Sequence, residues 1–229
     1  GCASIISNHI KHSHDFDMKM ETQDWLQQSY KKWCPTVEKN NKNCFSYLDI
    51  QSTFPLQKYT YSLVFNNKKM LLNLNMETKI RSGYPILILF PGYTASKESL
   101  SVYALWLRSL GYRIIISPGP NSEGEFDFGL NHAEEMQQLL KKQYDPNNKY
   151  IAIGFSMGIM AATTFTNSYP AVIGTIGVAP MQRFDIAVNN FEYYFGKIWW
   201  SRFFSKKNIF CLNFFLLRAF EGTTINRAC

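Results

Sequence analysis

The sequence has no uninterrupted apolar run of the roughly 18–20 residues that a membrane-spanning helix requires. Its richest apolar stretch, residues 195–220, is interrupted by five cations: Lys197, Arg202, Lys206, Lys207 and Arg218. Charge is also scarce, at 18% of residues against 46% hydrophobic residues, and this balance excludes a disordered chain. At 229 residues the chain is long enough for one sizeable core and short for two.

The sequence also lacks the spacings that mark metal and nucleic-acid sites. It has no CxxC pair, no zinc-finger spacing and no aromatic RNP strand. The net charge of +7 comes from scattered Lys and Arg residues, so we expect no nucleic-acid partner. His9, His12 and His14 lie in a polar segment without a convincing fourth ligand, and we interpret them as part of a flexible tether. We therefore expect neither a metal nor a cofactor.

Methionine is missing from the first position, where the chain reads Gly1-Cys2-Ala3-Ser4. This segment resembles the end of a bacterial lipoprotein signal, in which a small residue precedes a lipidated cysteine. The resemblance makes Cys2 the predicted lipid attachment site and the bacterial cell envelope the predicted location. A membrane surface is then a predicted partner, since two acyl chains on one residue anchor a protein stably. The alternative is an unremarkable cysteine in a cytoplasmic protein.

The remaining cysteines are Cys34, Cys44, Cys211 and Cys229. In an exported protein Cys34 and Cys44 could close a short loop. Four cysteines allow three full pairings, however, and the sequence does not choose among them.

The N-terminal part of the chain predicts a tail, a short helical segment and a hairpin. Residues 1–24 are polar and predict a tail or tether. Residues 25–33 predict an amphipathic helical turn or two, followed by a loop at 34–44. Two β-prone runs, 59–65 and 69–75, flank Asn66-Asn67, a pattern that favours a β-hairpin with a tight turn.

After Gly83 the pattern alternates between buried strands and helices. The predicted order is strand 85–90, helix 97–110, strand 112–117, helix 130–143, strand 150–154, helix 157–167 and strand 171–178. This alternation implies right-handed crossovers and a mostly parallel sheet with helices on both faces. The predicted fold class is therefore α/β, with its core at 25–180 and an aromatic, basic, helical cap at 181–229.

Gly154-Phe155-Ser156-Met157-Gly158 is a G-x-S-x-G motif between a predicted strand and a predicted helix. That context distinguishes a nucleophile turn from a chance match. Gly154 and Gly158 let the strand and helix backbones pass closely. The helix N-terminus supplies N–H groups and a partial positive charge where an oxyanion would form. Ser156 is thus the predicted nucleophile, and the alternative is a tight strand-to-helix turn with an idle serine.

This arrangement resembles the α/β-hydrolase superfamily, in particular its esterase, lipase and serine-aminopeptidase-like branches, over residues 59–180. The resemblance implies an α/β-hydrolase-like fold that is incomplete on its C-terminal side. It also implies an oxyanion hole formed by the backbone N–H groups of Tyr93 and Met157. Pro91 stands where the family has a histidine, but the donor is a backbone group and tolerates that change.

The chain departs from the family where the general base should be. A serine hydroxyl needs a base within hydrogen-bond reach, and no histidine follows Ser156. His132 opens the helix before the nucleophile strand, where a surface or N-terminal-turn role is the simpler interpretation. Asp185 could be the catalytic acid in the family's minority position, or it could cap a helix.

Three explanations stay open: a truncated serine hydrolase, a shortened relative kept as a binding module, or a base from another chain or an unusual residue. Segment 191–207 carries paired aromatics between cations, which suits an acyl-pocket cap, an interfacial helix or packing on the sheet. The predicted function is hydrolysis of a small ester or other acyl substrate by Ser156. The alternative is a non-catalytic protein of this fold that binds a membrane or a partner. The sequence does not determine the oligomeric state.

Overall fold

The computed structural model describes residues 24–35, 44–51, 59–65, 68–74, 83–93, 95–120 and 126–180. For residues 24–25 and for the strands between 59 and 74 it describes the backbone alone. Apart from Asp24, the predicted tail at 1–24 lies outside these ranges, as does the predicted cap at 181–229. Both assignments stay predictions.

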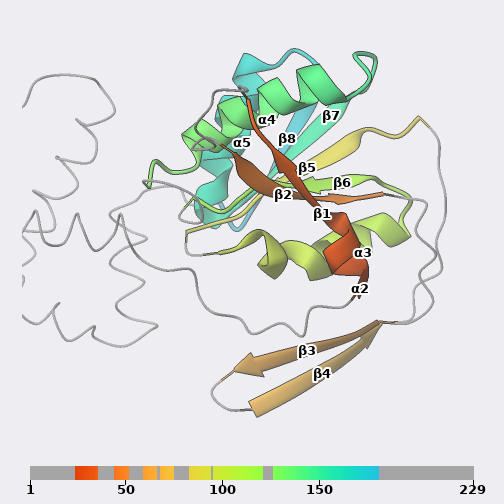
Figure 1. Ribbon diagram of the computed structural model, residues 1–229. Coiled ribbons are helices and arrows are strands. Elements are labelled where there is room, and N and C mark those ends of the chain that lie inside the picture. Colours follow the sequence, from red (N-terminus) through yellow and green to blue (C-terminus); the bar gives the residue numbers. More distant parts are fainter. Residues whose placement is uncertain are drawn as a thin grey trace, which may run out of the picture. The chain divides into compact units, whose positions relative to one another are not determined.

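The centre of the described fold is a six-stranded sheet in the order β1-β2-β6-β5-β7-β8 (Figure 1). Its parallel strands are β5 (Ile86–Phe90), β6 (Ile114–Ile116), β7 (Tyr150–Phe155) and β8 (Val172–Val178). Two further strands run antiparallel: β2 (Phe45–Ile50) pairs with β6, and β1 (Tyr30–Trp33) pairs with β2. The predicted α/β class with a mostly parallel sheet is confirmed.

Helices lie on both sides of this sheet (Figure 1). The core cluster on one face includes residues of α4 (Leu130–Gln143) and α5 (Ile159–Ser168). The cluster on the other face includes residues of α3 (Ser101–Ser109), which follows a 3-10 turn at Lys97–Leu100, and of the short helix α2 (Asp24–Ser29). The helices predicted after Gly83 are confirmed.

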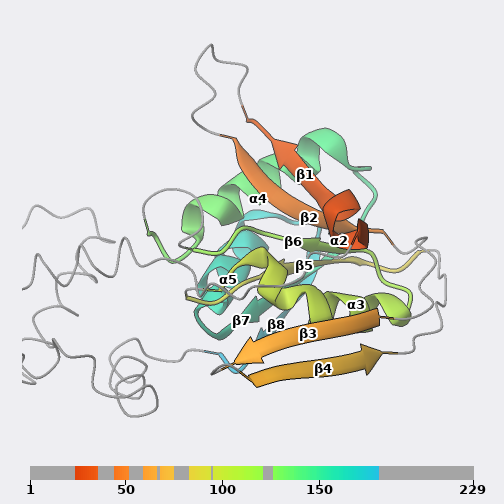
Figure 2. The ribbon, with the colours of Figure 1, turned by 60° about the horizontal axis from the view of Figure 1, so that its bottom comes forward.

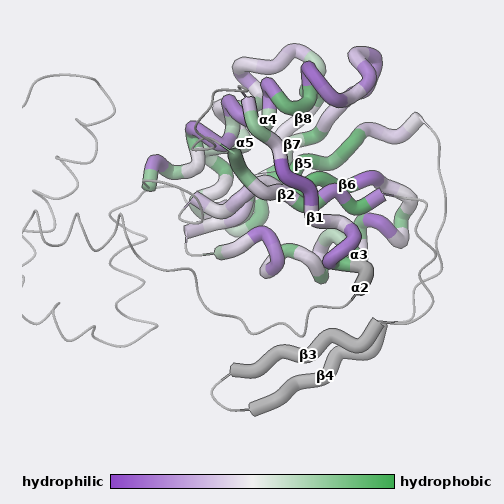
Figure 3. Tube along the Cα trace, in the orientation of Figure 1, coloured by the Kyte–Doolittle hydropathy of each residue, from purple (hydrophilic) through white to green (hydrophobic). Residues whose placement is uncertain are grey.

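β5 shows how the sequence specifies two core layers. Ile86, Ile88 and Phe90 pack in the cluster that contains α4 and α5, while Leu87 and Leu89 pack in the cluster that contains α3. All five residues are buried. Since successive side chains of a strand point to opposite faces, a strand covered on both sides is apolar at every position. This run is the continuous green segment of β5 in Figure 3.

β8 differs from this pattern. Ile173 and Ile176 are 60% and 48% exposed, so the prediction of burial on both faces is wrong for this strand. Among the described strands β8 pairs with β7 alone, which leaves it at an edge of the sheet. An edge strand buries its side chains only as far as its single neighbour and the adjoining helix cover them.

The prediction of helical turns over residues 25–33 is correct only at its start. Helix α2 ends at Ser29, and residues 30–33 form β1 in place of further helical turns. β2 was not predicted, because its apolar pattern is interrupted by Asp49, a carboxylate that is 5% exposed. Arg113 donates to both Asp49 oxygens, at 3.0 and 2.7 Å, and this tertiary ion pair makes the acidic residue compatible with a buried strand.

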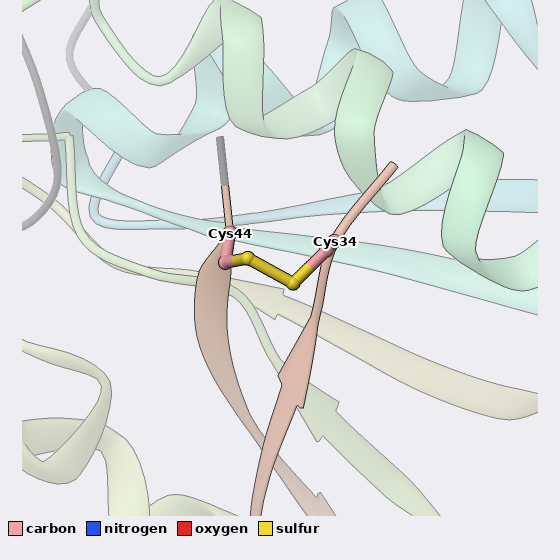
Figure 4. The surroundings of a disulfide bond; sticks show 2 residues. All are labelled: Cys34 and Cys44. Carbon is pink, nitrogen blue, oxygen red and sulfur yellow. A yellow bond between two sulfur atoms is a disulfide. The ribbon is translucent and has the colours of Figure 1, made fainter. Parts of the chain in front are cut away.

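A disulfide joins Cys34 to Cys44, the residues that follow β1 and precede β2 (Figure 4). The strand register sets Trp33 opposite Phe45, so the two cysteines are the next pair along the hairpin, with 4.1 Å between their Cα atoms. The structure thereby selects one of the pairings that the sequence left open.

The predicted β-hairpin is confirmed. β3 (Tyr59–Phe65) and β4 (Lys68–Leu74) form a separate two-stranded antiparallel ribbon (Figure 2). Phe65 pairs with Lys68 across Asn66-Asn67, and Tyr59 pairs with Leu74 at the other end. We refer to these two strands as the β3–β4 ribbon.

Candidate active site

Ser156 lies at the sharp turn between β7 and α5. β7 ends at Phe155, a 3-10 turn spans Ser156–Gly158, and α5 begins at Ile159. The backbone φ of Ser156 is +50°, in the left-handed region that costs a non-glycine residue about 1–2 kcal/mol. Ser156 is exposed, while Met157 and Gly158, the next two residues of the turn, are buried. A strained and exposed serine at a strand-to-helix turn is the geometry of a nucleophile elbow.

The glycines of the motif are required by close backbone contacts. A Cβ atom at Gly154 would lie 2.4 Å from the Cα of Ile159. A Cβ at Gly158 would lie 2.2 Å from the carbonyl oxygen of Phe90 and 2.5 Å from that of Pro91. Gly154 thus lets strand and helix approach each other, and Gly158 lets the turn approach the end of β5. The predicted reason for both glycines agrees with this packing.

The loop after β5 lies directly against the elbow. β5 and β7 are neighbours, with Phe90 opposite Gly154, so the chain leaves both strands at the same edge of the sheet. A Cβ at Gly92 would lie 3.2 Å from the Cβ of Ser156. Tyr93 follows Gly92, and the loop then turns back as the Ala95 N–H donates to the Gly92 carbonyl at 3.1 Å.

This arrangement brings together the segments of the two predicted oxyanion donors, Tyr93 and Met157. Met157 is the second residue of the turn that opens α5, where backbone N–H groups point away from the helix body. Tyr93 is one residue beyond Gly92, whose Cβ position touches Ser156. Their role as donors stays a prediction.

Aromatic side chains extend from the elbow in two directions. The ring of Tyr93 contacts Phe126 edge-on at 5.4 Å between centroids, and Phe126 contacts Phe128 at 4.7 Å. Phe155, the residue before the nucleophile, contacts Tyr103 of α3 at 5.0 Å. The segments that adjoin Ser156 therefore carry several aromatic side chains.

Sequence reasoning missed Phe126 and Phe128, which belong to no predicted element. Phe128 has a φ of +63° and Gly129 one of +79°. Asp127 stabilises this bend because its carboxylate accepts from the backbone N–H of Gly129 at 2.9 Å and of Asn131 at 2.6 Å. An aspartate followed by a glycine just before a helical pattern was the available signal, since Asp is a preferred helix cap.

His132 is the histidine that the described residues contain, and its contacts direct it away from Ser156. It lies in the first turn of α4 and is 6% exposed, so the predicted N-terminal-turn role holds and the surface role is wrong. Its Nδ1 lies 2.9 Å from a Glu135 oxygen, and its ring is 6.3 Å from that of Phe45. Phe45 belongs to β2, three strands from β7 and thus about 14 Å away at normal strand spacing.

A charged cluster ties the turn at Lys97–Leu100 to β1. The hydroxyl of Tyr30 donates to the Glu98 carboxylate, and Lys97 Nζ lies 3.6 Å from the same oxygen. Burial acts to raise the pKa of Glu98, but the hydrogen bond from Tyr30 and the charge of Lys97 outweigh it and lower that pKa. Burial raises the pKa of Tyr30, so the phenol keeps its proton. These contacts hold the turn at Lys97–Leu100, which follows the loop after β5, against β1.

Two predicted site residues, Cys2 and Asp185, lie outside the described residues, and their roles stay predictions. Within the described ranges no three His, Cys, Asp or Glu side chains gather as metal ligands would. No helix of the described part is long and apolar enough to cross a bilayer.

No protein-family model and no curated protein matches the sequence. Solved structures are similar at low identity. An esterase from Pyrococcus furiosus is 18% identical, with a TM-score of 0.46 over 79% of this chain and 63% of its own. A Pseudomonas aeruginosa protein classed among hydrolytic enzymes is 16% identical, with a TM-score of 0.44 over 90% of this chain and 68% of its own. A thioesterase domain from the curacin biosynthetic pathway is 16% identical, with a TM-score of 0.36 over 69% of this chain and 67% of its own.

The chain spans about two thirds of the length of these structures. Their TM-scores are low, so the fold assignment rests on the chain's own architecture. The described residues combine four features of the α/β-hydrolase-like fold. These are a mostly parallel sheet, helices on both faces, a serine elbow between strand and helix, and a loop from a neighbouring strand beside that elbow. The described core of this chain therefore has an α/β-hydrolase-like fold.

Proposed function

We propose that this protein transfers the acyl group of an ester to water through Ser156. The observation that carries the proposal is the backbone of Ser156, held at a φ of +50° and exposed at a turn whose two glycines cannot be replaced without a clash. Strained residues persist where the surrounding structure enforces them, and they gather at functional sites.

In this mechanism the Ser156 oxygen forms a bond to the carbonyl carbon and passes its proton to a general base. The tetrahedral oxyanion accepts hydrogen bonds from the Tyr93 and Met157 N–H groups. One donor of this kind is worth about 2.7–4 kcal/mol in other serine hydrolases. The bond to the alcohol then breaks, the base returns the proton to the alcohol, and water releases the acyl group from Ser156 by the same steps.

The base belongs to a residue outside the described ranges or to a second chain, because the described His132 is directed towards β2. The substrate is a small ester or other acyl compound with an apolar acyl group. Support for an apolar group comes from the rings of Tyr93, Phe126 and Phe155, which lie on or beside the segments around Ser156. An apolar acyl chain gains free energy from contact with such surfaces.

A second candidate is a non-catalytic protein that uses the hydrolase-like fold to bind a partner. The contacts of His132 with Glu135 and Phe45 favour it, since they leave Ser156 without a described base and a serine without a base is a weak nucleophile. The lipid anchor at Cys2 is a proposal that either function accommodates.

The two candidates are separated by labelling with a fluorophosphonate probe, read as an added mass on the intact chain. The enzyme is labelled on Ser156, and Ser156→Ala is not labelled. Ser168→Ala is the matched control, because Ser168 is also exposed and ends α5, the helix that follows the turn carrying Ser156. If the folded wild-type chain takes up no probe, or if Ser156→Ala is labelled equally, the catalytic proposal is wrong.

A further inference from the structure

Helix α3 presents an apolar stripe to solvent. Tyr103 and Trp106 of α3 and Leu110, the residue that follows it, are 49%, 54% and 42% exposed, and their spacing of three and four residues sets them on one side of the helix. The opposite face of α3 carries Ala104 and Leu105, both buried, and Ala104 packs in the core cluster on this side of the sheet. We call Tyr103, Trp106 and Leu110 the α3 stripe.

The stripe continues past the end of the helix. Tyr112 packs against the core cluster on this side of the sheet, and the ring of Tyr84 lies 5.0 Å from the Tyr112 ring. Tyr84 is itself 38% exposed. Exposed apolar residues that cluster in this way mark a surface that is covered by something else.

The register of the β3–β4 ribbon gives it an apolar face of its own. Residues directly opposite each other in an antiparallel pair share a face, and residues two apart along a strand do so too. By this register seven of the eight positions on one face are apolar: Tyr59, Tyr61, Leu63, Phe65, Met70, Leu72 and Leu74, with Lys68 at the turn. An isolated two-stranded ribbon is only marginally stable in water and needs a surface to pack on.

The two connections that join the ribbon to the core start near the C-terminal end of α3. β2 ends at Ile50, opposite Ile114 at the start of β6, and β5 begins at Ile86 on the other side of β6. Leu110 follows α3 and lies four residues before Ile114, so the helix ends at this same edge of the sheet. The shorter connection, residues 51–58, can span about 26 Å. The nine residues of α3 are about 14 Å long, which is within that reach.

We propose that the apolar face of the β3–β4 ribbon packs across the α3 stripe and forms an additional layer outside the helix. In this packing the apolar face of the ribbon and the α3 stripe bury each other's apolar side chains. The chain connects the two surfaces covalently. Connections this short give the ribbon an effective concentration in the millimolar range at the stripe, which a second copy of the chain or a membrane has to compete with.

Hydrogen exchange on the full chain tests this packing, with the amides of β3 and β4 as the readout. Leu71 and Leu72 are adjacent leucines on opposite faces of the ribbon. Leu72→Glu places a charge in the proposed contact, and we expect the amides of β3 to exchange about tenfold faster or more, as in a free ribbon. Leu71→Glu is the matched control, and we expect the exchange of β3 to stay as in the wild type.

A second pair of variants tests the helix side. Trp106→Glu is expected to accelerate exchange in the ribbon to the same extent, and Met160→Glu is expected to leave it unchanged. Met160 is likewise exposed but lies on α5, which packs on the other face of the sheet. Unchanged exchange of β5 and β7 in each variant verifies that the core is folded.

Four results would overturn the proposed packing. If Leu72→Glu and Leu71→Glu behave alike, or Trp106→Glu leaves the ribbon unchanged, the two surfaces are not in contact. If Trp106→Glu halves the mass measured by light scattering, a second copy covers the stripe. If the ribbon is protected only when anionic phospholipid vesicles are added, a lipid surface does. The fluorophosphonate result bears on none of these outcomes, so the two proposals fail independently.

Discussion

Replacing Gly158 by alanine tests the close packing on which the elbow depends. The added Cβ would lie 2.2 Å from the Phe90 carbonyl oxygen and 2.5 Å from that of Pro91, whereas ordinary contact begins at 3.4 Å. The turn or the end of β5 would have to move by about 1 Å. Overpacking costs about 1–3 kcal/mol, and both obstructing atoms belong to the backbone, so we expect about 3 kcal/mol for Gly158→Ala.

Gly174→Ala is the control for this substitution. Gly174 lies in β8, and a Cβ there would meet nothing within 4 Å. Loss of a glycine restricts the unfolded chain, so we expect this variant to be stabilised by about 0.5–1 kcal/mol. Urea unfolding followed by far-ultraviolet circular dichroism measures both free energies. Equal unfolding free energies for Gly158→Ala and Gly174→Ala would refute the steric argument.

The same variant connects packing to the proposed chemistry. The obstructing carbonyls precede Gly92 and Tyr93, so relief of the clash shifts the predicted oxyanion donor relative to Ser156. A displacement of about 1 Å in a reacting geometry can cost about 100-fold in rate. We expect the folded Gly158→Ala protein to react with the fluorophosphonate probe about 100-fold more slowly than Gly174→Ala. A wild-type rate would mean that the turn moves without disturbing the site.

Three further predictions concern stability. Arg113→Ala leaves the Asp49 carboxylate buried without its cation and should cost about 3–5 kcal/mol in urea unfolding. Asp49→Ala should cost less, because the Arg113 side chain is 34% exposed and can turn to water; the reverse order would contradict this account. Replacing Cys34 and Cys44 by serine should cost about 3 kcal/mol, since the disulfide closes a loop over ten residues, and an unchanged urea midpoint would contradict it. Burial raises the pKa of Tyr150 from 10.0 to about 12, so above pH 10 the unfolded chain loses this proton first and stability falls as pH rises towards 12. Tyr150→Phe should make the fall in urea midpoint shallower, and an identical alkaline profile would rule out this contribution.

Local patterns in the sequence were sufficient for the parallel core and for the elbow. Every residue of Ile86–Phe90 is apolar because both faces of β5 are covered, and this constraint acts on each position separately. The G-x-S-x-G motif was informative because its constraints are also mostly local. Apart from the contacts with the end of β5 and its loop, the close contacts of its glycines are with residues fewer than six positions away in the chain. The turn at Asn66-Asn67 was also a local signal.

Features that depend on distant residues could not be read from the sequence. Asp49 and Arg113 are 64 positions apart in the sequence. A charged residue argues against a buried strand unless its ion-pair partner is known, and the sequence does not show that these two residues meet. β1 and β2 are recognised by their pairing with each other and with β6, not by a clear period of two. The choice of Cys34 and Cys44 among the cysteine pairings depends on that same register.

The sequence by itself determined the βα alternation, the place of Ser156 and the need for glycine at 154 and 158, because hydrophobic period and turn chemistry act over a few neighbouring residues. The tertiary structure alone decided which segments meet at Ser156. It set the Gly92 loop against the elbow, Phe126 beside Tyr93, and His132 towards Phe45 of β2. The physical reason is that strand order fixes distances across a sheet, and strand order is a property of the whole packed chain rather than of any segment.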